Sequence, residues 1–189
     1  MHAMNIPTAV ASIRSEARRL GFTQSCDEKT GALLRTLVGS KPHGRILELG
    51  TGVGHSAAWI LDGMDAGSHL TSVEIEQSQL EIAKTALGLD LRVEFIHQDG
   101  ADFLDRCLQT FDLIFADAWP GKFTHRDRAI ALLRPGGLYI IDDLNLQPDW
   151  PTGHADNVER LIAAIEADPA LHIARISDST GLILACRAV

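Results

Sequence analysis

Strand-like and helix-like segments alternate along most of this chain. From residue 45 onward, each of five short apolar runs is followed by a segment with helical spacing of apolar residues. The five runs lie at residues 45–49, 69–75, 91–96, 111–117 and 138–142. A helix that connects consecutive strands makes them parallel, so this order predicts a parallel sheet with helices on both faces.

The end of the chain departs from that alternation. Residues 171–188 read as two strands joined by a turn at residues 178–181, which is too short for a crossover and predicts antiparallel pairing. We therefore expect an α/β fold of three layers, a doubly wound, mostly parallel, seven-stranded sheet with a C-terminal antiparallel strand.

Two helices are expected before the first strand. Residues 8–20 have helical spacing and end at Gly21, and a second helix is expected to open with a capping box formed by Ser25 and Glu28. Residues 1–189 are expected to form a single domain, with a core at residues 45–189. The helices of residues 1–40 are expected to act as a lid or to contact the substrate or a second copy in a homodimer.

Charge and composition restrict the class of function. A formal net charge of −8 argues against non-specific nucleic-acid binding, which needs a basic surface. Three cysteines (Cys26, Cys107 and Cys186) form no disulfide framework, which is typical of a reduced, cytoplasmic protein. No secretory signal and no apolar run of about 18 residues is recognised. We expect a small-molecule substrate rather than nucleic acid or a membrane.

The stretch "ILELGTGVGHSA" at residues 46–57 predicts a strand, a glycine turn and a helix. Gly50, Gly52 and Gly54 lie where glycines let the backbone approach a ligand at a helix N-terminus. A dinucleotide fingerprint would place Gly or Ala at position 55, where this chain has His55. Glu74 ends the second strand, where a ribose-binding acid is expected. Together these features favour an adenosine-containing ligand, and the spacing at His55 argues against NAD. The alternatives are a glycine turn that only lets the chain reverse tightly, and a Glu74 that is a solvated strand end.

Longer motifs carry a family resemblance. "ELGTGVG" followed by "VEIE" resembles class I S-adenosyl-L-methionine-dependent methyltransferases, and "FDLIFADAW" with "LLRPGGLYIIDDL" resembles the catechol and caffeoyl-CoA O-methyltransferase family. The resemblance covers about residues 23–145. It implies a Rossmann-like methyltransferase fold, S-adenosyl-L-methionine as cofactor, and methyl transfer to a hydroxyl of a phenolic or catechol-like small molecule.

The same resemblance implies the cofactor-binding residues. They are Glu48, Gly50, Gly52, Gly54, His55, Ser56, Glu74, Asp99, Gly100, Ala101 and Asp117. In that family the residue matching Glu74 holds the ribose hydroxyls, and the one matching Ser56 touches the methionine carboxylate. The family commonly has Gly-Asp-Ala where this chain has Asp99-Gly100-Ala101, so a helix N-cap is the alternative role for Asp99.

A divalent metal site is also implied. By resemblance, Asp117, Asp142 and Asp143 would bind Mg²⁺ or another divalent cation, with Asp143 in place of the family's Asn. Neighbouring residues of a regular strand point oppositely, so Asp142 and Asp143 can both bind only if the strand ends there. The alternative is that Asp117 and Asp142 serve the cofactor or the loop structure alone.

The catalytic residues implied are Asp117 and Lys122. The family has a lysine three residues after the first Asp, whereas this chain has Pro120 there and Lys122 two residues later. An ordinary surface lysine is the alternative, with His125 and His154 as other candidate bases.

The loop at residues 145–154 is expected to contact the substrate, with Trp119 and Trp150 at the mouth of the site. Loop or core packing is the alternative role for each ring. Two other functions stay open: an NAD(P)-dependent oxidoreductase, and a non-catalytic S-adenosylmethionine-binding module. His55 counts against the oxidoreductase, as does the lone tyrosine, Tyr139, which lies in a strand.

Overall fold

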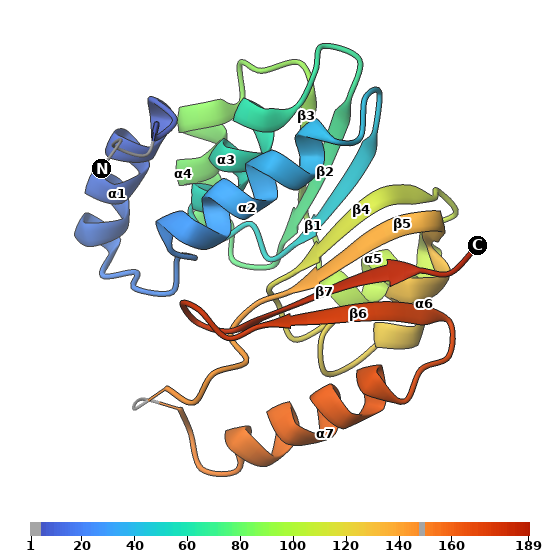
Figure 1. Ribbon diagram of the computed structural model, residues 1–189. Coiled ribbons are helices and arrows are strands. Elements are labelled where there is room, and N and C mark those ends of the chain that lie inside the picture. Colours follow the sequence, from blue (N-terminus) through green and yellow to red (C-terminus); the bar gives the residue numbers. More distant parts are fainter. Residues whose placement is uncertain (1–4, 148–149) are drawn as a thin grey trace.

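Seven strands form one sheet in the order β3-β2-β1-β4-β5-β7-β6 (Figure 1). The computed structural model describes residues 5–147 and 150–189, so residues 148–149 of the expected substrate loop lie outside the described residues, as do residues 1–4. The strands are β1 (Arg45–Leu49), β2 (His69–Glu74), β3 (Val93–His97), β4 (Phe111–Ala116), β5 (Leu133–Ile141), β6 (Leu171–Ile176) and β7 (Leu182–Arg187). Both antiparallel pairings of the described residues involve β7, which pairs with β5 and β6, and the other pairings are parallel, which confirms the expected mostly parallel sheet.

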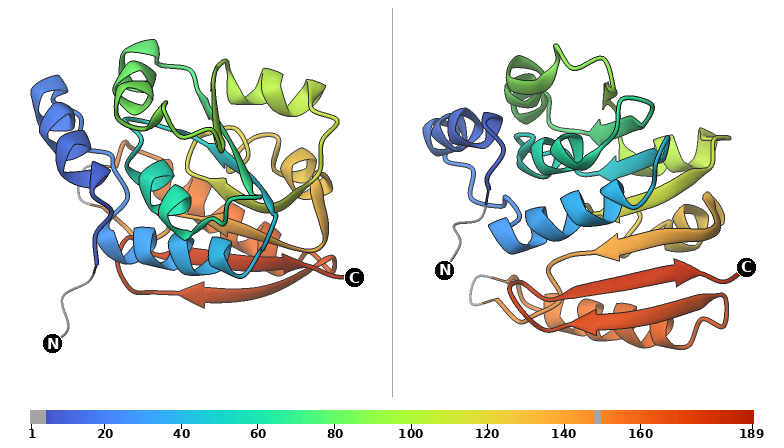
Figure 2. Two further views of the ribbon diagram at one scale, coloured as in Figure 1. Left: turned by 90° about the horizontal axis from the view of Figure 1, so that it is seen from above. Right: turned by 45° about the horizontal axis from the view of Figure 1, so that its top comes forward.

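Seven helices accompany the strands of the described chain. They are α1 (Ala9–Leu20), α2 (Glu28–Gly39), α3 (His55–Gly63), α4 (Gln77–Leu87), α5 (Gly100–Arg106), α6 (Arg126–Ala131) and α7 (His154–Glu166). Figures 1 and 2 show α1 to α4 on one face of the sheet and α5 to α7 on the other. Within the described residues, none of these helices has the length and apolar character needed to cross a bilayer.

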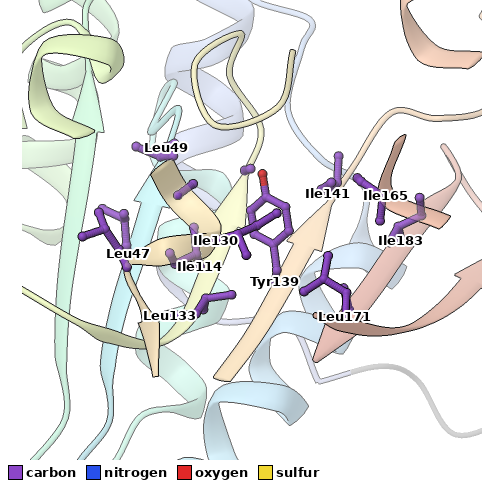
Figure 3. Packing of buried hydrophobic residues seen from close by; sticks show 14 of the residues in the cluster. Leu47, Leu49, Ile114, Ile130, Leu133, Tyr139, Ile141, Ile165, Leu171 and Ile183 are labelled. Atoms are coloured by element: carbon purple, nitrogen blue, oxygen red, sulfur yellow. The ribbon is translucent and has the colours of Figure 1, made fainter. Parts of the chain in front are cut away.

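Alternate residues of the central strands supply the two hydrophobic cores. In β4, Leu113 and Phe115 pack with α1 to α4, whereas Ile114 and Ala116 pack with α5 to α7. Figure 3 shows the second of these cores, with the ring of Tyr139 inside it. This two-sided burial explains why the strand segments are almost continuously apolar.

The strand order reverses between β1 and β4. From β1 the chain adds β2 and then β3 on one side, and then returns to add β4 and β5 on the other side. The loops after β1 and β4 therefore separate at the carboxyl edge of the sheet, which is where ligands bind in open parallel sheets.

Two expected boundaries are wrong. Helix α2 begins at Glu28 and is capped by Asp27, whose carboxylate accepts the Thr30 N–H at 2.8 Å, so Ser25 is not the cap. Strand β5 begins at Leu133 rather than residue 138, because Leu133 pairs with Phe111 and a register shift before Leu113 accommodates the turn-like "RPGG" inside the strand.

The buried hydroxyl of Tyr139 gives a stability prediction. It finds no hydrogen-bond partner among residues 5–147 and 150–189, and its desolvation costs about 1–3 kcal/mol. Tyr139→Phe should therefore leave the free energy of unfolding unchanged or raise it by about 1 kcal/mol in urea titrations. Tyr139→Ala should lower it by about 3–5 kcal/mol because it leaves a cavity. A loss above about 1 kcal/mol for Tyr139→Phe would mean that the hydroxyl is hydrogen-bonded.

Candidate functional site

A cavity of about 310 Å³ opens at the carboxyl ends of β1, β2 and β4. Its wall combines the glycine turn after β1, the end of β2, the start of α5 and the end of β4. The connection between α1 and α2 also lines the cavity, with Phe22 and the segment Gln24–Cys26. The volume is at the lower end of the range for small-molecule sites.

The carboxylate of Glu74 ties the end of β2 to the glycine turn. Its Oε2 accepts the Gly52 N–H at 2.7 Å, and its Oε1 accepts the Ile75 and Glu76 N–H groups, each at 2.9 Å. An ionised carboxylate has about four acceptor positions, so one remains for a hydroxyl donor from the cavity. Glu74 both shapes the site and retains an acceptor in it.

The glycines of the turn are required by the protein itself. Gly50 has φ 96°, and a Cβ there would lie 2.7 Å from the carbonyl oxygen of Asp117. Gly54 has φ 90°, and its Cβ would lie 2.8 Å from Cβ of Ala83. Backbone conformation and close packing thus demand these glycines even before any ligand binds.

The N-terminus of α3 forms part of the cavity wall. Its N-cap, Gly54, offers no side-chain cap, and His55 and Ser56 in the first turn line the cavity. An uncapped helix N-terminus favours an anionic group. Burial and the charge of Arg14 lower the pKa of His55 to about 4, so the imidazole is neutral near pH 7; its Nδ1 lies 3.5 Å from Cys26 Sγ.

Asp99 caps helix α5 while it lines the cavity. Its Oδ1 accepts the N–H groups of Ala101 at 2.7 Å and Asp102 at 3.3 Å. The helix N-cap is therefore confirmed, and Asp99 and Gly100 also form the wall opposite the glycine turn.

Three aspartates meet where β4 and β5 end. Strand β5 stops at Ile141, and Asp143 adopts a left-handed conformation with φ 56°. Asp117 and Asp143 consequently both line the cavity, although Asp143 follows Asp142 directly. Asp142 accepts hydrogen bonds from the Thr180 hydroxyl and from the Asp143 N–H.

Asp117 and Asp142 both have raised pKa values. Burial and the negative charge of Asp142 raise the pKa of Asp117 well above its ordinary value. Burial also raises the pKa of Asp142 to about 6, and the charge of Asp143 adds to this. The positive charge of Lys122 opposes both shifts, so the ammonium lies near the pair.

Lys122 is buried rather than an ordinary surface lysine, with 5% of its area exposed. Gly121, with φ 86°, makes the turn that precedes it, and the Gly121 N–H donates to the Thr124 carbonyl at 2.7 Å. Lys122 Nζ lies 5.4 Å from the ring centre of Phe123. The shift of two positions along the sequence thus does not remove this lysine from the aspartates.

The cavity gathers most of the expected cofactor residues. Those lining it are Gly50, Gly52, His55, Ser56, Glu74, Asp99, Gly100 and Asp117. The expected residues Glu48, Gly54 and Ala101 lie outside the lining: Glu48 is buried in β1, Gly54 packs on Ala83, and Ala101 lies within α5. Sequence reasoning missed the wall formed by Phe22, Gln24, Ser25 and Cys26, because no motif marks that connection.

The rings at residues 119–154 form one aromatic group. The ring centre of Trp119 lies 4.5 Å from that of Phe123. His154 packs against Phe123 at 5.2 Å and against Trp150 at 4.6 Å. His125 is turned toward Asp105, with Nε2 3.8 Å from Oδ1. Neither histidine lines the first cavity.

Comparisons with known proteins agree with this architecture. The structure of TomG from Streptomyces achromogenes, an O-methyltransferase of tomaymycin synthesis solved with S-adenosylmethionine, superposes with a TM-score of 0.85 at 24% identity, covering 100% of this chain and 93% of that one. An O-methyltransferase from Bacillus cereus, solved with S-adenosylhomocysteine, gives 0.81 at 20% identity, covering 99% and 93%. At these identities the likeness shows the fold, that of Rossmann-like methyltransferases.

The sequence itself shows the family. The sequence profile of the O-methyltransferase family matches residues 10–188, so this chain belongs to that family. A relative from Mycolicibacterium vanbaalenii, provisionally named an O-methyltransferase, is 32% identical over 146 residues, which are 74% of this chain and 64% of the relative. The chain spans between about half and two thirds of the length of the curated relatives it matches.

Glu48 gives a prediction on pH and stability. Burial raises its pKa to about 7, against a smaller opposing effect of hydrogen bonds from Ser56 and Ser72. The folded pKa exceeds the unfolded one, so the contribution of Glu48 to stability is fully present below about pH 4.5 and is lost as pH rises through about 7. Glu48→Gln has no such loss. The difference in free energy of unfolding, variant minus wild type, should therefore increase by about 2–3 kcal/mol as the pH rises from 5 to 8.

The measurement is urea unfolding of both proteins at several pH values. Ser68→Ala, at the opposite edge of the sheet, is the control and should show no pH-dependent difference. A constant difference between Glu48→Gln and the wild type across this range would contradict the assigned pKa.

Proposed function

We propose that this chain is an S-adenosyl-L-methionine-dependent O-methyltransferase that acts on a hydroxyl of a phenolic or catechol-like small molecule. The observation that carries the proposal is the Glu74 carboxylate at the end of β2, bonded to the glycine turn and lining a cavity of about 310 Å³. Family membership supports the same activity. The bound cofactor would supply an electrophilic methyl group on its sulfonium.

The chain's residues suit the parts of this cofactor. We assign the ribose hydroxyls to the free acceptor position of Glu74, and the adenine to the wall at Asp99 and Gly100. The carboxylate of the amino-acid part is assigned to the N-terminus of α3 at Ser56, because an uncapped helix end favours an anion. Asp117 and Asp143 then face the transferable methyl group and the acceptor.

Lys122 and Asp117 are assigned to proton transfer and positioning. Lys122, in the wall of a second cavity, is the proposed general base for the acceptor hydroxyl, and Asp117 would orient that hydroxyl toward the methyl group. These residues would hold the resulting oxyanion for in-line transfer of the methyl group, with S-adenosylhomocysteine as the leaving group, and their rigid placement would supply much of the acceleration.

Metal assistance is a separate part of the prediction. Among residues 5–147 and 150–189, no group of three His, Cys, Asp or Glu side chains is placed to hold a metal ion. Asp142 Oδ1 accepts hydrogen bonds from both the Thr180 hydroxyl and the Asp143 N–H. The side chains present do not fit a three-carboxylate site, and no step of the proposal passes through a metal.

Chelation distinguishes methyl transfer by the chain's own residues from methyl transfer that needs a metal ion. If the chain's own residues suffice, methyl transfer should keep more than about half of its rate after dialysis against EDTA, and added Mg²⁺ should not raise it. A loss of tenfold or more that Mg²⁺ restores would instead support the Asp117, Asp142 and Asp143 site implied by resemblance.

Cofactor binding tests the central assignment. Glu74→Gln keeps the shape but loses the charge, and should weaken S-adenosylhomocysteine binding by about 10–100-fold, since charged hydrogen bonds contribute about 1.5–3 kcal/mol. Isothermal titration calorimetry measures the Kd. Glu81→Gln, an exposed change on α4, is the matched control and should bind as the wild type does. No binding to the wild type at millimolar ligand would overturn the proposed function.

A further inference from the structure

A second cavity, of about 440 Å³, lies between the loop that follows β4 and helix α7. Its lining contains four cationic side chains, Lys122, Arg126, Arg128 and Arg160, and one carboxylate, Asp127. This concentration of positive charge is unexpected in a chain with a formal net charge of −8. We call this site the basic cavity.

Most of the positive charge in the basic cavity is not neutralised. Arg126 Nη2 donates to Asp127 Oδ1 at 2.7 Å, which compensates one cation. Arg128 donates to the carbonyls of Leu104 at 3.0 Å and Cys107 at 2.6 Å, which are neutral acceptors.

Arg160 likewise has a neutral partner, since its Nη2 donates to Asn157 Oδ1 at 2.6 Å. A guanidinium has five donors, so Arg160 retains several for a ligand. It lies on the exposed side of α7.

Lys122 adds a further cation to the wall of the basic cavity. Its side chain is buried, with 5% of its area exposed. Its positive charge also opposes the raised pKa values of Asp117 and Asp142, so this cation is partly compensated from the acidic side.

The walls of the basic cavity indicate the shape of that ligand. The rings of Trp119 and Phe123 both line it, with centres 4.5 Å apart, and Trp119 is half exposed. Aromatic walls favour a planar group. The same short loop carries Asp117 in the wall of the first cavity and Lys122 in the wall of the basic cavity, so a molecule that spans this loop would contact both cavities.

We propose that the basic cavity makes this protein selective for flat acceptors that carry an acidic group, which Arg160 binds at the end remote from the reacting hydroxyl. The inference rests on the proposed function and names the substrate class of that site. Guanidinium groups bind carboxylates and phosphates through paired hydrogen bonds, so both are suitable acidic groups.

The test compares an acid with its neutral analogue. Calorimetry measures the binding of 3,4-dihydroxybenzoate and of its methyl ester to protein saturated with S-adenosylhomocysteine. The wild type should bind the acid at least about tenfold more tightly than the ester. Arg160→Gln should reduce this preference to about threefold or less, and Arg160→Lys should keep more of it because the charge remains.

Two controls make the result specific. Arg19→Gln, which removes a charge from the exposed surface of α1, should leave the preference unchanged. Titration with inorganic phosphate alone separates an acidic acceptor from a free anion: phosphate that binds as tightly as the acid would overturn the proposal.

Equal affinities for acid and ester, an unchanged preference in Arg160→Gln, or no binding of the acid would each overturn it as well. The titration with S-adenosylhomocysteine in the same experiment reports on the proposed function independently. If that cofactor product fails to bind, the acid and ester are compared in its absence, so both inferences remain separately testable.

Discussion

The hydrogen bond from the Gly52 N–H to the Glu74 carboxylate is the contact on which the site depends. It fixes the turn after β1 against the end of β2, in addition to the parallel pairing of these two strands. The turn can approach so closely only because Gly50 and Gly54 adopt conformations that other residues rarely take. A ligand therefore meets a preformed wall, which reduces the entropy that binding must overcome.

Electrostatics divides the carboxyl edge of the sheet into two environments. The first cavity holds carboxylates, and their burial and mutual repulsion raise the pKa values of Asp117 and Asp142. The basic cavity holds uncompensated arginines, including Arg160. Lys122 lines the basic cavity, and its positive charge opposes the raised pKa values of both aspartates. Such opposed fields can orient an acceptor with a hydroxyl at one end and an acidic group at the other.

Much of the fold could be predicted from local patterns, and the reason is physical. Apolar strands buried on both faces and helices with one apolar stripe leave distinct periodicities, so the sheet and the position of Glu74 follow from the sequence. The start of β5 could not be predicted, because "RPGG" has the chemistry of a turn and only pairing with Phe111 makes it a strand. Local propensity gives way to tertiary contacts there.

Only those parts of the site that lie in a recognisable sequence motif could be predicted. The wall at Phe22 and Cys26 comes from a connection without a motif, and the return of Lys122 to the aspartates depends on the turn at Gly121. The most direct test is a crystal structure with S-adenosylhomocysteine. We expect both ribose hydroxyls within hydrogen-bonding distance of Glu74, with the sulfur facing Asp117. A ligand bound elsewhere, or a ribose that does not contact Glu74, would contradict this expectation.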